Sequence, residues 1–319
     1  MRRRRRFVAL PVILVGLAVI AACGGSDPAP ANTTNPQGSI AGNSASGFVN
    51  SSGGASGSNG ASSGSNGNTG PQPSGLTETT EESMDFNGTA RPYLLTKPKT
   101  LTDGKKYPLV ISFHGTPGSP KEMHDQLPFD YKSQDGAFVA YPAAGDGTEW
   151  NLNLPSDGNA DMDFVKALID ELAGKNPIDP ARVLGFGYSG GGYFLSQYAC
   201  RVGGVLKMVA IISGGAPELR DGDQKRANEC VICPAGPIPM FISHGMADTS
   251  EVPFEGGDFA RICWAEQNGC GNSSYSNIGG PCVAYKGCEK PVQWCAVPDL
   301  GHAPWNESIG AAWAMFNGL

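Results

Sequence analysis

The stretch "RVLGFGYSGGGYF", Arg182–Phe194, places a single serine between glycines at the end of an apolar run. Ser189 fits the pattern Gly-x-Ser-x-Gly, and the residues before and after it read as a strand and a helix, the context that this pattern requires. In so tight a turn, side chains at Gly187 and Gly191 would collide with their surroundings. The alternative is an ordinary glycine-rich turn, because the chain has 45 glycines. Ser189 is therefore a candidate nucleophile whose role depends on the rest of the chain.

Six short apolar runs predict strands of a largely parallel sheet that is buried on both faces. Between the second and third runs, apolar residues recur at helical spacing over residues 161–175, which predicts an amphipathic helix with acidic residues in its first turn. This alternation predicts an α/β fold whose functional loops follow the carboxyl ends of the strands. The runs are Pro108–Phe113, Phe138–Tyr141, Arg182–Gly187, Met208–Ser213, Pro239–His244 and Val292–Val297.

A serine hydroxyl is a weak nucleophile unless a base removes its proton, and the base needs an acid to orient it. The chain has four histidines, and His302 lies just after the last predicted strand. Asp248 lies just after the preceding strand. Taken alone, His302 reads as a structural histidine and Asp248 as a solvated loop carboxylate. The order Ser189, Asp248, His302, each at the end of a strand, is that of the α/β-hydrolases and predicts a catalytic triad.

An oxyanion hole needs two backbone N–H groups, one from the residue after the nucleophile and one from an early loop. Gly190 supplies the first. The loop "SFHGTPGS" follows the first predicted strand, and Pro117 has no N–H, so Thr116 is the expected second donor. His114 in this loop and His244 in a similar "HG" pair are expected to have structural roles rather than to act as rival bases.

Five segments, "HGTPGS", "IDPARVLGFGYSGGG", "SHGMADTSEVPF", "CWAEQNGC" and "CVAYKGCEKPVQWCAVPDLGHAPW", lie between about residue 89 and residue 319. Through them the chain resembles carbohydrate esterase family one, the feruloyl and acetylxylan esterases, with the related polyhydroxybutyrate depolymerases. The resemblance implies an α/β-hydrolase fold and a serine esterase that hydrolyses carboxylic esters, feruloyl or acetyl esters of plant polysaccharide, through an acyl-enzyme. No metal or organic cofactor is implied. The residues assigned by the resemblance are Ser189, Asp248 and His302 as nucleophile, acid and base, and Thr116 and Gly190 as the oxyanion hole.

Two other functions stay open at this point. A polyester depolymerase would use the same triad on an aliphatic hydroxyacid chain, and a tethered binding protein would keep the fold without catalysis, although it would more naturally lack a triad residue. Pro117 stands where the relatives often have glycine, which bears on the shape of the acyl pocket. Trp150, Trp264 and Trp305 are candidates for lining a sugar or aromatic-acid site, with a place in the core as the alternative. We expect a monomer.

The N-terminus has the layout of an export signal: the arginines of residues 2–6, an apolar run over residues 7–22, and "IAAC" ending at Cys23. A small-residue pair before a cysteine resembles the lipobox of bacterial lipoproteins, in which Cys23 would carry lipid. A plain cleavable signal peptide and a twin-arginine signal are the alternatives. The glycine- and serine-rich composition that follows predicts a flexible tether. We therefore predict a signal peptide over 1–22, a tether over 23–75 and one catalytic domain over 76–319.

The charge of the chain restricts its binding partners, and its cysteine content indicates the cellular compartment in which it folds. The net charge of −7 and the isoelectric point near 5.1 argue against nucleic acid as a partner. Eight cysteines besides Cys23 form an even set in an exported protein, so up to four disulfides are expected, with roughly a hundred pairings open. A metal or redox site at the "CVIC" segment is the alternative. The cysteines are Cys200, Cys230, Cys233, Cys263, Cys270, Cys282, Cys288 and Cys295.

Overall fold

Six parallel strands form the centre of one sheet, and all six lie where the sequence predicts strands. The computed structural model describes residues 75–153, 158–249, 252–271 and 274–319. The central strands are buried on both faces by flanking helices, which is why their sequences read as unbroken apolar runs. In spatial order they are β4 (Phe138–Pro142), β3 (Tyr107–Phe113), β5 (Ile178–Tyr188), β6 (Met208–Ile212), β7 (Met240–Gly245) and β10 (Val292–Val297).

An antiparallel pair of strands extends each edge of the sheet, and neither pair is predicted from the sequence. β1 (Thr77–Phe86) and β2 (Thr89–Pro98) pair beside β4, while β9 (Cys282–Tyr285) and β8 (Tyr275–Gly279) continue from β10. The described residues thus form a ten-stranded sheet. β1 and β8 are largely polar and exposed, as suits edge strands.

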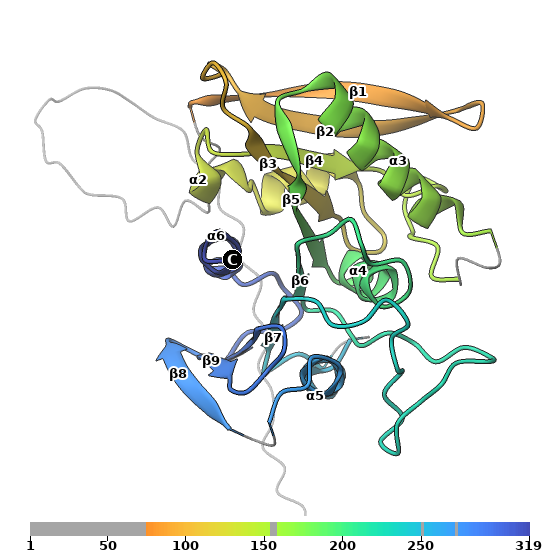
Figure 1. Ribbon diagram of the computed structural model, residues 1–319, viewed down its shortest axis with the longest axis vertical. Helices are drawn as coiled ribbons and strands as arrows, with labels where there is room; N and C mark the ends of the chain where they lie inside the picture. Colours follow the sequence, from red (N-terminus) through yellow and green to blue (C-terminus); the bar gives the residue numbers. More distant parts are fainter. Residues whose placement is uncertain (1–74, 154–157, 250–251, 272–273) are drawn as a thin grey trace, which may run out of the picture. The chain divides into compact units, whose positions relative to one another are not determined.

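Helices cover both faces of the sheet (Figure 1). The core on one face includes residues of three helices, and the core on the other face includes residues of the helices near the C-terminus and after β3. The predicted α/β class, a mostly parallel sheet flanked by helices, is confirmed. The first face carries α3 (Ala160–Lys175), α4 (Gly190–Arg201) and α5 (Phe254–Gln267), and the second carries α1 (Pro120–Gln126), α2 (Asp130–Ser133) and α6 (Ser308–Asn317).

The predicted amphipathic helix is α3, and its sequence explains both its start and its orientation. The Asn159 side chain caps the helix by accepting hydrogen bonds from the backbone N–H groups of Asp161 and Met162. Two aspartates in the first turn complement the helix dipole. Phe164, Leu168 and other apolar residues at helical spacing are fully buried against the sheet.

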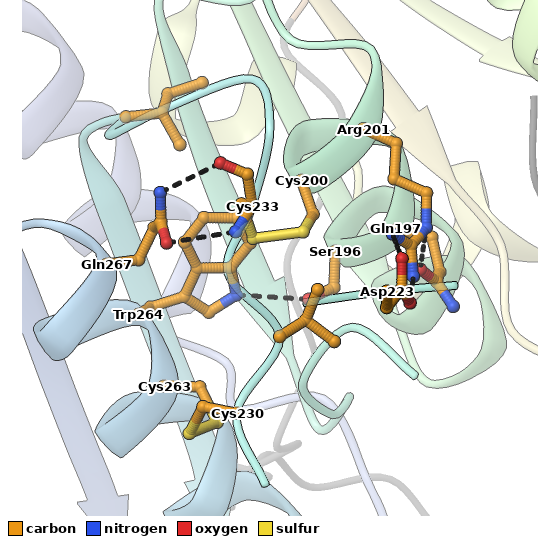
Figure 2. The surroundings of a disulfide bond; sticks show 12 residues. Ser196, Gln197, Cys200, Arg201, Asp223, Cys230, Cys233, Cys263, Trp264 and Gln267 are labelled. Carbon is orange, nitrogen blue, oxygen red and sulfur yellow. Dashed lines mark hydrogen bonds and ion pairs between the residues drawn. A yellow bond between two sulfur atoms is a disulfide. The ribbon is translucent and has the colours of Figure 1, made fainter. Parts of the chain in front are cut away.

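All eight cysteines in the described part of the chain form disulfides, as predicted. The two cysteines of "CVIC" lie in the loop between β6 and β7 and form disulfides with two different helices (Figure 2). Cys233 is bonded to Cys200 of α4, and Cys230 is bonded to Cys263 of α5. They are therefore structural, which corrects the alternative of a metal or redox pair. Gln267 of α5 adds hydrogen bonds to the backbone of Cys233. The four bonds are Cys200–Cys233, Cys230–Cys263, Cys270–Cys288 and Cys282–Cys295.

The predicted signal peptide over 1–22, the lipid-bearing Cys23 and nearly all of the predicted tether lie outside the described residues. Among the helices that the structure describes, none combines the length and the apolar character needed to cross a bilayer.

Candidate active site

Ser189 lies on the tight turn that joins β5 to α4. Its backbone has φ +50° and ψ −120°, a conformation that costs a non-glycine residue about 1–3 kcal/mol. Ser189 occupies the N-cap position of α4, yet its side chain makes no capping hydrogen bond. The hydroxyl therefore does not cap the helix, as a serine at this position usually does, and it contacts His302 instead.

The two glycines that flank the turn are required by close backbone contacts. A Cβ atom on Gly187 would lie 2.5 Å from the carbonyl oxygen of Gly191. A Cβ atom on Gly191 would lie 2.5 Å from the carbonyl oxygen of Phe113 on β3. Real Cβ atoms essentially never come this close to backbone, so both positions need glycine because a larger side chain would collide with the neighbouring backbone, as predicted.

The structure brings Ser189, His302 and Asp248 into one hydrogen-bonded chain. Ser189 Oγ lies 2.9 Å from His302 Nε2, and His302 Nδ1 lies 2.7 Å from Asp248 Oδ2. An ionised carboxylate only accepts, so Nδ1–H donates to Asp248 and the bare Nε2 accepts the serine proton. The Asp248 side chain is fully buried, whereas that of His302 is 25% exposed. The carboxylate is thus kept from water, while part of the imidazole is open to solvent.

Two residues that are not predicted from the sequence, Tyr188 and Ser213, hold the loop of His302. The ring of Tyr188 stacks on the imidazole, with centroids 5.6 Å apart, and its hydroxyl donates to the His302 carbonyl oxygen at 3.3 Å. Ser213 Oγ donates to the carbonyl oxygen of Ala303 at 3.1 Å. Burial, with the nearby Asp248 charge, raises the pKa of Tyr188, so its hydroxyl stays a donor. Tyr188 precedes the serine directly, which is the one signal that could have identified it.

The loop after β3 lies against the start of α4, where the second oxyanion donor is predicted. A Cβ atom on Gly190 would lie 3.1 Å from the backbone nitrogen of Thr116 and would overlap the Thr116 side chain. His114 is 1% exposed; its Nδ1–H donates to the Gly115 carbonyl oxygen at 2.7 Å, and its Nε2 accepts from Ala144 N–H at 3.4 Å. The neutral His114 ring therefore shapes this loop, in keeping with the structural role predicted for it.

The three tryptophans predicted to line a substrate site lie in different surroundings. Trp264 is 1% exposed and its Nε1–H donates to Ser196 Oγ at 3.1 Å (Figure 2). The prediction is wrong for Trp264, because no face of its ring is left for a substrate. Trp150 stacks on Phe194 and lines a hollow of about 560 Å³. Trp305 lines a second hollow beside α6. A substrate role for Trp150 and Trp305 stays a prediction.

We expect the stability of the fold to fall as the pH drops below about 6.5, through two buried histidines. Burial lowers the pKa values of His114 and His244 below the ordinary 6.5. Below pH 6.5 the unfolded chain therefore binds protons that the folded protein does not yet bind. Each histidine should cost up to about 1.4 kcal/mol of unfolding free energy per pH unit. Urea unfolding at pH 8, 6.5 and 5.5 measures this slope. His114→Gln should reduce the slope of unfolding free energy against pH by the contribution of one histidine. A slope equal to that of the wild type would contradict the prediction.

The chain is similar in sequence to feruloyl esterases. No protein-family model matches it. Feruloyl esterase B of Piromyces equi is 26% identical over 235 residues, which cover 67% of this chain and 42% of that protein. Probable feruloyl esterase C of Aspergillus clavatus is 26% identical over 244 residues, which cover 72% of this chain and 82% of that protein. The chain thus spans less than half of the Piromyces protein and most of the Aspergillus one.

The fold is similar to that of a solved esterase. The acetyl xylan esterase from Aspergillus awamori superposes with a TM-score of 0.60 at 16% identity, covering 75% of this chain and 99% of that structure. The chain has the α/β-hydrolase fold. The parallel sheet, the serine turn at the end of β5 and the flanking helices agree with the fold class predicted from the sequence.

Proposed function

We propose that the protein is a serine esterase that cleaves carboxylic esters through an acyl-enzyme. The observation that carries this proposal is the chain from Ser189 Oγ through His302 to the buried Asp248. As Ser189 Oγ bonds to the ester carbonyl carbon, its proton passes to His302 Nε2. The Asp248 carboxylate keeps Nδ1 protonated and stabilises the imidazolium. His302 then gives its proton to the departing alcohol, and the acyl group stays on Ser189.

The second half of the reaction returns the enzyme to its starting state. A water molecule gives a proton to His302 Nε2 as its oxygen bonds to the acyl carbon. The bond to Ser189 Oγ breaks, the serine regains the proton from His302, and the carboxylic acid leaves. The oxyanion that forms in each half is stabilised by the backbone N–H groups of Gly190 and Thr116. Their closeness supports this role, and losing one such donor typically costs about 3 kcal/mol of transition-state stabilisation.

We propose feruloyl or acetyl esters of plant polysaccharide as the substrate class. The support comes from the relatives named feruloyl esterase. For acetyl esters it comes from a protein of Neocallimastix patriciarum named a bifunctional acetylxylan esterase/xylanase, which is 26% identical over 143 residues that cover 44% of this chain and 19% of that protein. The four disulfides fit an oxidising compartment, which supports an exported protein. Tethering through lipid on Cys23 and a monomeric state belong to the same proposal.

An ester panel tests the proposed function. The full chain is assayed on methyl ferulate, acetylated xylan and polyhydroxybutyrate, with Ser189→Ala as the matched variant. We expect hydrolysis of the first two esters by the wild type and a loss of about three orders of magnitude or more in kcat in the variant. Clearance of polyhydroxybutyrate alone would replace the proposed substrate by an aliphatic polyester. Activity that persists in the variant, or a wild type inert on every ester, would overturn the triad assignment and favour a binding protein.

A further inference from the structure

A second histidine contacts the carboxylate oxygen that holds His302. His244 lies on β7, and Asp248 follows in the turn that begins at Gly245. His244 Nε2 lies 3.1 Å from Asp248 Oδ2 and 2.9 Å from the carbonyl oxygen of Val252. Asp248 Oδ2 therefore lies between two imidazole rings, at 2.7 Å from His302 and 3.1 Å from His244.

His244 donates to Asp248 as a neutral ring. Both neighbours of Nε2 are acceptors, so this nitrogen carries the proton. Nδ1 is buried and has no hydrogen-bond partner in the described part of the chain, so a proton there would be left unsatisfied. Among the residues that the structure describes, the titratable groups that act on the ring are Asp248, from the turn, and His302, from the loop after β10. The elements packed against it present uncharged residues, Phe254 and Gly257 of α5 and Ala296 of β10.

Helix α5 leaves room for this ring only because residue 257 is glycine. A Cβ atom on Gly257 would lie 2.5 Å from His244 Cγ and would overlap Nδ1. A Cβ atom on Gly256, by contrast, would meet nothing closer than the Tyr193 hydroxyl at 3.6 Å. The packing of α5 thus fixes the imidazole of His244 from the side opposite to Asp248.

We propose that His244 is a positioning residue for the triad: its Nε2–H holds the buried Asp248 carboxylate so that Oδ2 faces Nδ1 of His302. A buried carboxylate needs several donors to stay ionised and fixed, and a neutral imidazole supplies one without adding a charge that would compete with His302. The ring thus does more than the structural role predicted from its "HG" pair. This inference rests on the proposed esterase function and goes beyond it.

The comparison of His244→Leu with His244→Gln tests the donor. Leucine fills the space without an N–H, whereas the glutamine amide can donate from nearly the same place. We expect kcat to fall about 10- to 100-fold in the leucine variant with KM little changed, and to stay within about threefold of wild type in the glutamine variant. A leucine variant with wild-type kcat, or equal losses in both variants, would overturn the inference.

Two glycine variants test the same contact without changing His244. Gly257→Ala should displace the ring and lower kcat as His244→Leu does, while Gly256→Ala, in the same helix, should leave kcat within about twofold of wild type. If His244→Leu fails to fold, this pair decides, and equal kcat values in the pair would overturn the inference. Ser189→Ala separates the two proposals: a kcat close to wild type there contradicts the esterase mechanism itself, whereas the expected large loss in Ser189→Ala beside unaffected His244 variants contradicts only this inference.

Discussion

Replacing His302 by alanine should lower kcat for ester hydrolysis by about ten-thousand-fold, and removing Ser189 as well should lower it little further. The reason lies in the two contacts of the imidazole, 2.9 Å to the serine oxygen and 2.7 Å to the carboxylate. Without a base the serine keeps its proton, and without the serine the base has no proton to take. The two residues therefore act as a unit, and the double variant measures whether their losses add.

A histidine outside the site supplies the control. His124→Ala removes an imidazole from α1, where the ring contacts Thr79 and packs on Tyr141, and it should leave kcat unchanged. Circular dichroism and thermal unfolding confirm that each variant is folded. Losses that multiply in the double variant would show that Ser189 and His302 act independently. A His302→Ala variant that keeps a tenth of the wild-type kcat would contradict its role as the base.

Replacing Arg91 by alanine is expected to lower the free energy of unfolding by about 3–5 kcal/mol, because it leaves a buried charge without its partner. Arg91 on β2 is 5% exposed and Asp161 on α3 is 2% exposed. Arg91 Nη2 lies 2.7 Å from Asp161 Oδ1 and also donates to the Ala143 carbonyl oxygen at 2.9 Å. Asp161 Oδ2 accepts from the backbone N–H of Asn151 at 2.9 Å. The pair therefore holds the loop after β4 at its start, Ala143, and near its middle, Asn151.

Urea unfolding of Arg91→Ala beside Lys166→Ala measures the difference between a buried and an exposed ion pair. Lys166 Nζ lies 2.7 Å from Asp170, and both side chains are more than half exposed, so its loss should cost less than about 0.5 kcal/mol. Replacing Arg91 and Asp161 together by methionine and leucine should recover part of the stability. An Arg91→Ala variant within about 1 kcal/mol of wild type would contradict the prediction.

The sequence predicts the centre of the sheet but not its edges, and the reason is burial. β3 and β6 are buried at every residue, so their apolar runs are visible without any structure. β1 has the sequence TETTEESMDF, of which only Thr77 and Met84 are buried, so it shows no apolar alternation. β1 pairs with β2 through backbone hydrogen bonds at the solvent-exposed edge of the sheet. Such bonds do not depend on apolar side chains, so the composition of the segment does not predict them.

The candidate site is predictable to the extent that it depends on chain order. Parallel strands place their carboxyl ends at one edge of the sheet, so Ser189, Asp248 and His302 could be expected to meet there. Trp264 could not be assigned correctly, because an aromatic side chain that lines a site and one that fills the core have the same sequence signal. His244 reads as a packing residue because nothing in "SHGMAD" reveals that its Nε2 shares an acceptor with His302.

The amino-acid sequence by itself determines the parallel sheet and the serine turn, and it predicts the residues of the triad that we propose, because apolar periodicity, glycine positions and residue order are local properties of the chain. Only the tertiary structure decides the four cysteine pairings, the buried Arg91–Asp161 ion pair and the second donor to Asp248. Each of these is a contact between two side chains that come together only when the strands and helices pack. Arg91 and Asp161 are 70 positions apart and 2.7 Å from atom to atom, and such a contact produces no periodic pattern in the sequence.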